Sequence, residues 1–313
     1  MSALAFGLLA LALVGPVPAM LARSSWPLRA PRAAIVLWQS IAVAAVLSAF
    51  SAGLALAARL LVPGPDGRPT ADVRSEIGVL GWPLWVISVL TLAVTFLIGI
   101  RLVVSVAAVA IGTRRRRARH RMVVDLLGEC RQELDGARVL DVSEPLAYCL
   151  PGLRSRVVLS AGTLKALTPP EVTAILRHER AHLRARHDLV LEAFIAVHTA
   201  FPRFVRSGSA LSAVALLIEA LADDAAVRTA GRSPLARALV ACASAQTPAG
   251  ALAAGGPSTL IRVQRLSGRP NSLMLSIGAY LAAAAVLVVP TIAVAVPWLT
   301  ELSRLFQAGI TLP

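Results

Sequence analysis

Four long apolar stretches dominate the pattern of hydrophobic and polar positions along the chain. They are residues 2–21, 33–58, 77–111 and 273–298. A helix rises 1.5 Å per residue, so twenty helical residues cover about 30 Å, the thickness of the hydrocarbon core of a bilayer. The pattern therefore predicts four transmembrane helices, the first three at about residues 2–21, 33–58 and 81–106. The third stretch, interrupted only by Arg101, is longer than a bilayer requires, so its inner end should project beyond the membrane.

A cleaved signal peptide is the alternative interpretation of the first stretch. Such a peptide begins with a basic region, whereas here Arg23, Arg29 and Arg32 follow the apolar residues. Basic residues accumulate on the cytosolic side of a membrane helix. We therefore expect a transmembrane helix with its N-terminus outside the cell.

Residues 112–272 are the part of the chain able to form a soluble domain. Apolar periodicity predicts helices at residues 122–134, 188–205 and 209–227, and short strands at residues 137–142 and 156–160. The last two helices are apolar, but one is short and the other contains acidic residues, so neither should span a membrane. We expect them to be buried in the domain or to lie at the membrane face. The second strand is a candidate edge strand.

Composition supports membrane insertion and argues against two other classes of protein. The chain is 57% hydrophobic with a mean hydropathy of +0.72, too apolar for an ordinary soluble protein. Its formal net charge is +14, but no basic block alternates with aromatic residues, so no direct nucleic-acid partner is expected. Cys130, Cys149 and Cys242 show no paired spacing, which argues against a disulfide framework.

Arginine clusters beside the apolar stretches predict the orientation of the chain. Six arginines lie among residues 114–121, which is typical of a cytoplasmic stop that touches anionic lipid. Three more precede the fourth stretch and are interpreted as the same signal: Arg262, Arg265 and Arg269. We therefore expect a multi-pass protein of the cell membrane. Residues 1–111 would hold three spans, residues 112–272 would be cytosolic, and residues 273–313 would form the fourth span and a short extracellular tail.

A His-Glu-x-x-His motif carries the candidate chemistry. At 3.6 residues per turn, His178 and His182 lie one above the other on one helix face, where two neutral imidazoles can bind one zinc ion. Glu179 is about 100° further round and can reach a water molecule beside the metal. The alternative is a helix with two hydrogen-bonded core histidines, which the motif alone leaves open.

The helix that carries the motif has a clear start. Thr168 can cap the amide of Glu171, Pro169 fits the first helical position, and Glu171 can reach back, which together make a capping box. Apolar residues then follow at helical spacing and indicate a buried stripe. The motif should therefore sit on a rigid, partly buried helix.

A catalytic zinc site needs a third protein ligand and an open position. In the metzincin pattern the third histidine would occupy position 188, which is Asp188, so that subclass is excluded. Glu219 and Asp223 are one helical turn apart in apolar sequence, where a bare charge would be costly. We interpret Glu219 as the third ligand and Asp223 as the acceptor that orients a ligand histidine. Glu192 is the alternative ligand, and Asp224 faces elsewhere.

These features resemble the BlaR/MecR family of integral-membrane zinc peptidases and, more distantly, the HtpX and CAAX-prenyl-protease metallopeptidases. The resemblance rests on the motif with His187 and Asp188 behind it, on Phe201 and Pro202, and on the downstream acidic pair, all between a third and a fourth span. Antibiotic-sensing members carry a large extracellular penicillin-binding domain, whereas this sequence stops at Pro313. Beta-lactam sensing is therefore not expected.

The resemblance implies a mostly α membrane protein, with four transmembrane helices and a cytosolic α+β zincin-like (gluzincin) metallopeptidase domain between the third and fourth. It implies one zinc ion per chain, bound by His178, His182 and Glu219. Glu179 would be the general base, with Asp223 behind the ligands, and His187 would be structural.

The expected activity is zinc-dependent hydrolysis of peptide bonds. Arg228 and Tyr148 are candidate stabilisers of the transition state, and substrate should add as a strand beside residues 156–160. The expected role is regulated cleavage of a cytosolic transcriptional repressor of the BlaI/MecI type. The alternatives are HtpX-like quality control of membrane proteins and a non-catalytic membrane scaffold. Several arginines on the motif helix argue against a peptidase that cuts within the membrane.

Overall fold

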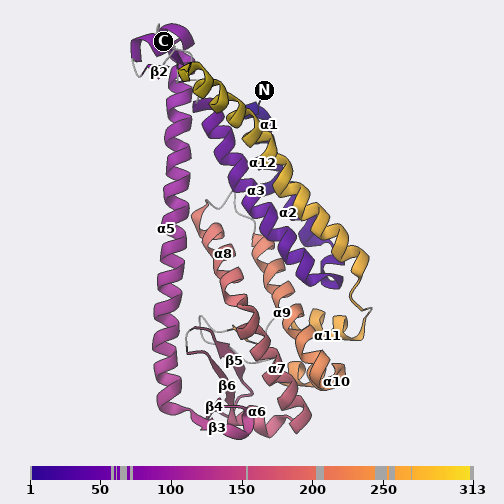
Figure 1. Cartoon of the computed structure of the whole chain (residues 1–313). Helices are drawn as coiled ribbons and strands as arrows, with labels where there is room; N and C mark the ends of the chain where they lie inside the picture. Colours follow the sequence, from indigo (N-terminus) through magenta and orange to yellow (C-terminus); the bar gives the residue numbers. More distant parts are fainter. Residues whose placement is uncertain are drawn as a thin grey trace.

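The structure of the chain is a computed structural model. It describes residues 2–57, 60, 62–63, 69–70, 73–152, 154–201, 208–243, 252–253, 258–268 and 270–310. Pro202 and Arg269, which the sequence analysis singled out, lie outside these residues. Figure 1 shows a small sheet with α6 and α7 at one end, and both termini toward the opposite end.

Four helical stretches in the described part of the chain are long and apolar enough to cross a membrane, as predicted. They are residues 3–23, 31–57, 82–127 and 273–292. The first combines α1 (Ser2–Val14) and α2 (Pro16–Arg23), which separate at Gly15 because proline lacks an amide hydrogen and clashes with the preceding turn. The second is α3 (Pro31–Ala57), which follows η1 (Trp26–Arg29). The chain is thus a multi-pass membrane protein by length and composition.

Short elements join the second and third spans. β1 (Val62–Pro63) pairs antiparallel with β2 (Pro69–Thr70), and α4 (Val73–Leu80) follows. The fourth span begins α12 (Leu273–Ile310), whose helical backbone continues past residue 298, where the apolar stretch of the sequence ends.

The third span belongs to α5 (Trp82–Leu127), one continuous helix of 46 residues and about 69 Å. It runs through the arginine cluster, so Arg117 is buried against the protein rather than placed in a loop. The helix predicted at residues 122–134 is wrong beyond Leu127. A side chain at Gly128 would lie 2.7 Å from a carbonyl of the preceding turn, and β3 (Glu129–Arg131) and η3 (Gln132–Leu134) follow it.

In the described residues, five strands form a mixed sheet in the order β3-β4-β6-β5-β7. The remaining strands are β4 (Ala137–Leu140), β5 (Ala147–Leu150), β6 (Arg156–Ser160) and β7 (Leu252–Ala253). β4 is parallel to β6 and the other pairs are antiparallel. Strands are therefore confirmed at both predicted places, residues 137–142 and 156–160, but the first ends at Leu140 and the second is not an edge strand. It is buried almost throughout, as a central strand covered on both faces is.

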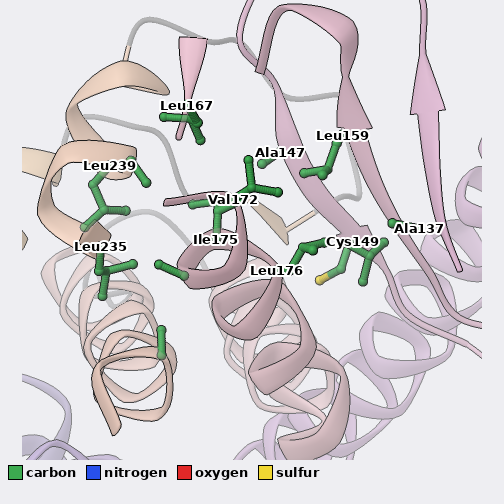
Figure 2. Packing of buried hydrophobic residues seen from close by; sticks show 14 of the residues in the cluster. Ala137, Ala147, Cys149, Leu159, Leu167, Val172, Ile175, Leu176, Leu235 and Leu239 are labelled. Carbon is green, nitrogen blue, oxygen red and sulfur yellow. The ribbon is translucent and has the colours of Figure 1, made fainter. Parts of the chain in front are cut away.

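The core of the α+β part lies between the sheet and α7 (Pro169–Ala185), as Figure 2 shows. Val172, Ile175 and Leu176 on one stripe of α7 pack in the same cluster as residues of β5 and β6. Leu235 and Leu239 of α10 (Arg232–Ala241) cover the helix from another side. α6 (Ala161–Ala166) connects the sheet to α7. This packing fixes the helix that carries the motif.

α8 (His187–Ala200) and α9 (Gly208–Ala230) link the α+β part to the membrane helices. α9 contacts both α7 and α3. Leu217 and Ile218 share a buried cluster with Trp38 of α3, whereas Ala226 belongs to the cluster around α7. Neither helix is among the candidate spans of the described chain, in agreement with the sequence analysis.

Candidate metal centre

The start of α7 sets the position of the motif. The amide of Thr168 donates to Oε2 of Glu171 at 2.9 Å, and the predicted capping box is present. With the first turn held, the buried stripe of α7 continues from its apolar residues to His178 and His182. Those two histidines and Glu179 are completely buried. The sequence analysis therefore located both the helix and its inward face correctly.

Three side chains from two helices converge at the end of this stripe. Nε2 of His178 lies 3.1 Å from Nε2 of His182. Oε2 of Glu219, on α9, lies 3.4 Å from Nε2 of His178, and its Oε1 lies 3.6 Å from Nε2 of His182. These residues form a group of three ligands able to hold one metal ion. The structure thus joins the predicted third ligand to the histidine pair.

The spacing of the three donors fits zinc. Zinc forms bonds of about 2.0–2.2 Å to imidazole nitrogen and carboxylate oxygen, and tetrahedral angles then separate neighbouring donors by about 3.3–3.6 Å. The observed separations of 3.1, 3.4 and 3.6 Å are close to that range. Two histidines and one glutamate also leave a fourth position for water, as a catalytic zinc site requires.

Glu179 follows His178 on α7 and, in the described part of the chain, lies among the ligands without a cationic partner of its own. Both of its carboxylate oxygens are buried, and in the described residues the polar group that interacts with them is the weakly donating thiol of Cys149, not a strong hydrogen-bond donor. Burial raises the pKa of Glu179 to about 7. A buried acid without a strong hydrogen-bond donor or a cation is costly, so this placement indicates a chemical role rather than a contribution to stability.

Each ligand histidine has a partner at its second nitrogen. Nδ1 of His178 lies 3.0 Å from Oδ1 of Asp223, which leaves Nε2 free for the metal. Burial opposes a charge on His178, but the carboxylates of Asp223 and Glu219 outweigh burial and raise its pKa to about 9. Nδ1 of His182 lies 3.0 Å from Nδ1 of His187, and burial lowers the pKa of His182 to about 3. His187 therefore supports a ligand, as the resemblance implied.

Comparison with known families agrees with the geometry of the ligand set. Residues 113–270 match peptidase family M48. The chain belongs to peptidase family M48. Comparisons with curated proteins and with solved structures find no match. The M48 match and the ligand set of two histidines and one glutamate together define a zinc metallopeptidase of the gluzincin type.

The alternative third ligand of the M48 domain is engaged elsewhere. Oε1 of Glu192 lies 2.7 Å from Nη1 of Arg117, and Oδ2 of Asp188 lies 3.1 Å from the same nitrogen. Both acids on α8 therefore neutralise an arginine of α5 rather than approach the metal ligands. Asp224 pairs with Arg265 at 2.8 Å, which agrees with its expected position outside the site.

The two candidate stabilisers of the transition state receive no support from their positions. Arg228 is exposed near the end of α9. The hydroxyl of Tyr148 lies 2.9 Å from Nε2 of His120, and burial raises the pKa of Tyr148 to about 12. Tyr148 belongs to a different buried cluster from Cys149, which faces α7. Neighbouring residues of a strand point to opposite faces, so Tyr148 lies on the face away from the metal centre.

Sequence reasoning missed one residue of the M48 site. Arg262, on α11 (Thr259–Ser267), was interpreted as a membrane-flanking charge, but its side chain is 1% exposed and contacts both Glu219 and Asp223. Burial opposes the ionisation of Asp223, but hydrogen bonds from Arg262 and His178 outweigh burial and lower its pKa. The sequence of α11 held no clear signal for this role, because Arg262 and Arg265 both have the pattern of membrane-flanking charges.

Proposed function

We propose that the protein is a membrane-anchored zinc endopeptidase in which Glu179 is the general base. The observation that carries this proposal is the buried carboxylate of Glu179, which is adjacent to the ligand set and has only the weakly donating thiol of Cys149 as a side-chain donor in the described residues. A general base works best when its pKa is near the working pH, and burial brings the pKa of Glu179 to about 7.

The roles of the chain's own groups follow from their positions. Zinc, when bound by His178, His182 and Glu219, supplies Lewis-acid activation of water and of the scissile carbonyl. Glu179 takes a proton from the attacking water at a carboxylate oxygen and passes it to the departing amine. Asp223 keeps His178 in the tautomer whose Nε2 is a ligand.

The position of the sheet changes the expected path of a substrate. β6 pairs with β4 on one side and β5 on the other, so it cannot accept a peptide as a further strand. β5 lies beside α7, and its outer edge pairs in the described residues with the two residues of β7. β7 is the last strand on that side in the described residues, so we infer that an extended substrate pairs with the outer edge of β7, an arrangement that binds main chain and tolerates varied side chains.

We further propose that residues 112–272, which contain the M48 match, face the cytosol and that the N-terminus and the chain end after the fourth span face outward. Both termini lie toward the end of the molecule opposite the sheet, as Figure 1 shows. The arginine cluster lies on the part of α5 nearer the sheet. Phosphatase fusions test this: activity is expected after residue 66 and none after residue 260. The reverse pattern would refute the orientation.

Regulated cleavage of a cytosolic repressor is the role that we propose, by resemblance to the BlaR/MecR family. Two features support signal relay. α5 runs without interruption from the segment after β2 to the sheet, and α9 packs on α3 while it carries Glu219. A stimulus on the membrane helices could thus alter the population of competent sites. The expected substrate is a BlaI/MecI-like repressor.

The decisive comparison uses strains that carry Glu179→Gln, Glu219→Gln or Glu192→Gln. Glu179→Gln should retain one zinc per chain and lose peptidase activity, because it removes the base and keeps the ligands. Glu219→Gln should lose zinc, whereas the matched change Glu192→Gln should not. Transcript profiles should differ between wild type and Glu179→Gln under envelope stress. Unchanged transcripts with accumulated damaged membrane proteins would contradict the repressor and favour HtpX-like quality control.

A further inference from the structure

α11 places an arginine inside the metal centre. Nη1 of Arg262 lies 2.9 Å from Oε2 of Glu219. Its Nη2 lies 2.6 Å from Oδ1 of Asp223 and its Nε lies 2.9 Å from Oδ2 of the same carboxylate. The guanidinium therefore donates two hydrogen bonds to Asp223 and forms an ion pair with Glu219 through its third nitrogen. One side chain ties a metal ligand to the acid that orients another ligand.

The two acids need such a partner. Glu219 and Asp223 stand one turn apart on α9, and their side chains are 15% and 0% exposed. Two nearby, largely buried carboxylates repel each other and each loses hydration, so their placement side by side is costly unless a positive group pairs with both. Arginine stays charged in proteins, and its planar fork matches a carboxylate with two parallel hydrogen bonds. Arg262 supplies a fixed positive charge where the chain brings two negative ones together.

The contacts also constrain the direction of each carboxylate. Nη1 of Arg262 lies 2.9 Å from Oε2 of Glu219, which is also 3.4 Å from Nε2 of His178, while Oε1 of Glu219 lies 3.6 Å from Nε2 of His182. Asp223 presents Oδ1 both to Arg262 and to Nδ1 of His178. A substitution of Arg262 should therefore affect Glu219 directly and His178 through Asp223.

We propose that Arg262 is a positioning residue for zinc, which holds Glu219 and Asp223 in the orientation that the metal requires. This inference rests on the zinc-peptidase function proposed above, but metal affinity tests it without need for Glu179 to act as a base. Outer partners of metal ligands typically contribute 10-fold to 100-fold to metal affinity.

Arg265 provides a matched control on the same helix. Its guanidinium lies 2.8 Å from Asp224 and donates at 2.7 Å to the carbonyl oxygen of Leu28. Arg265 therefore attaches α11 to α9 and to the segment before α3, and Arg262 likewise attaches α11 to α9. Unlike Arg262, Arg265 contacts neither a metal ligand nor Asp223 in the described structure. A loss of zinc caused only by poor docking of α11 would appear in both variants.

The experiment compares the full-length protein in detergent with Arg262→Gln, Arg262→Lys and Arg265→Gln. Zinc affinity is measured by competition with a chromophoric chelator, and the site is examined by the visible spectrum of bound cobalt. Arg262→Gln should bind zinc 10-fold to 100-fold more weakly with an altered cobalt spectrum, because Glu219 loses its anchor. Arg262→Lys should recover part of the affinity, since it restores the charge without the fork. Arg265→Gln should stay within about twofold of wild type.

Kinetics separate positioning from simple loss of metal. With zinc saturating, Arg262→Gln should lower kcat for peptide cleavage and leave KM within about twofold, because the residue acts on the ligands and not on substrate. Wild-type zinc affinity in Arg262→Gln would overturn the proposal, and so would an equal loss in Arg265→Gln. If Arg262→Gln does not fold, the affinity of Arg262→Lys decides: a value equal to wild type would refute a role for the fork. Failure of Glu179→Gln to lose activity would instead refute the proposed function.

Discussion

Replacement of Arg117 by methionine should loosen the attachment of α5 to α8. Nη1 of Arg117 lies 3.1 Å from Oδ2 of Asp188 and 2.7 Å from Oε1 of Glu192. The three side chains are 9%, 4% and 14% exposed, so water screens the charges little. Methionine keeps most of the apolar stem but removes the charge, which leaves two acids buried without their shared partner.

The size of the effect follows from burial. Removal of one partner from a buried ion pair costs about 3–5 kcal/mol. A domain of 150–250 residues loses about 2–4 °C in Tm per kcal/mol, so Arg117→Met should lower Tm by roughly 6–20 °C. Arg131 and Glu129 form a matched exposed pair at 3.6 Å, with side chains 45% and 78% exposed. Arg131→Met should cost no more than about 1 kcal/mol.

Thermal unfolding of the detergent-solubilised protein, followed by tryptophan fluorescence, measures both variants. In the Arg117→Met background, the further changes Asp188→Asn and Glu192→Gln should restore part of the lost Tm, because neutral amides are less costly to bury than unpaired carboxylates. The reasoning is refuted if Arg117→Met and Arg131→Met unfold at the same temperature. It is also refuted if the variant with all three changes is no more stable than Arg117→Met.

Three further results are expected. Zinc at 100 times its Kd contributes about 2.7 kcal/mol to stability, so its removal by a chelator should lower the Tm of the wild-type protein by roughly 5–11 °C. Calorimetry of His178→Ala should show no change in Tm when the chelator is added. Gly162→Ala should lower Tm, because its new methyl group would collide with the backbone carbonyl of Ser143, whereas Gly78→Ala meets no neighbouring atom and should be neutral or stabilising. Ile175 is completely buried, so Ile175→Ala should lower the free energy of unfolding by about 2–5 kcal/mol. An unchanged midpoint of denaturant unfolding would contradict the packing around α7.

The sequence by itself determined the features that depend on local periodicity. An apolar run longer than a bilayer is thick has few alternatives to a membrane helix, so four spans followed from hydropathy. The capping box at Thr168 and the four-residue spacing of His178 and His182 are properties of one helix. The same spacing rule identified Glu219 and Asp223 as a pair, because two acids in apolar sequence need a partner.

Tertiary structure decided which separate segments share a site. The pairing of Glu219 with the histidines joins positions about forty residues apart and depends on the packing of α9 against α7. β6 is a central strand because β4 and β5 pair with its two edges. The alternation of apolar and polar residues along one strand cannot show how many partners that strand has. Arg262 has the same local signature as a membrane-flanking arginine. Only the docking of α11 on α9, with two buried carboxylates in need of a counter-charge, turns it inward to the metal centre.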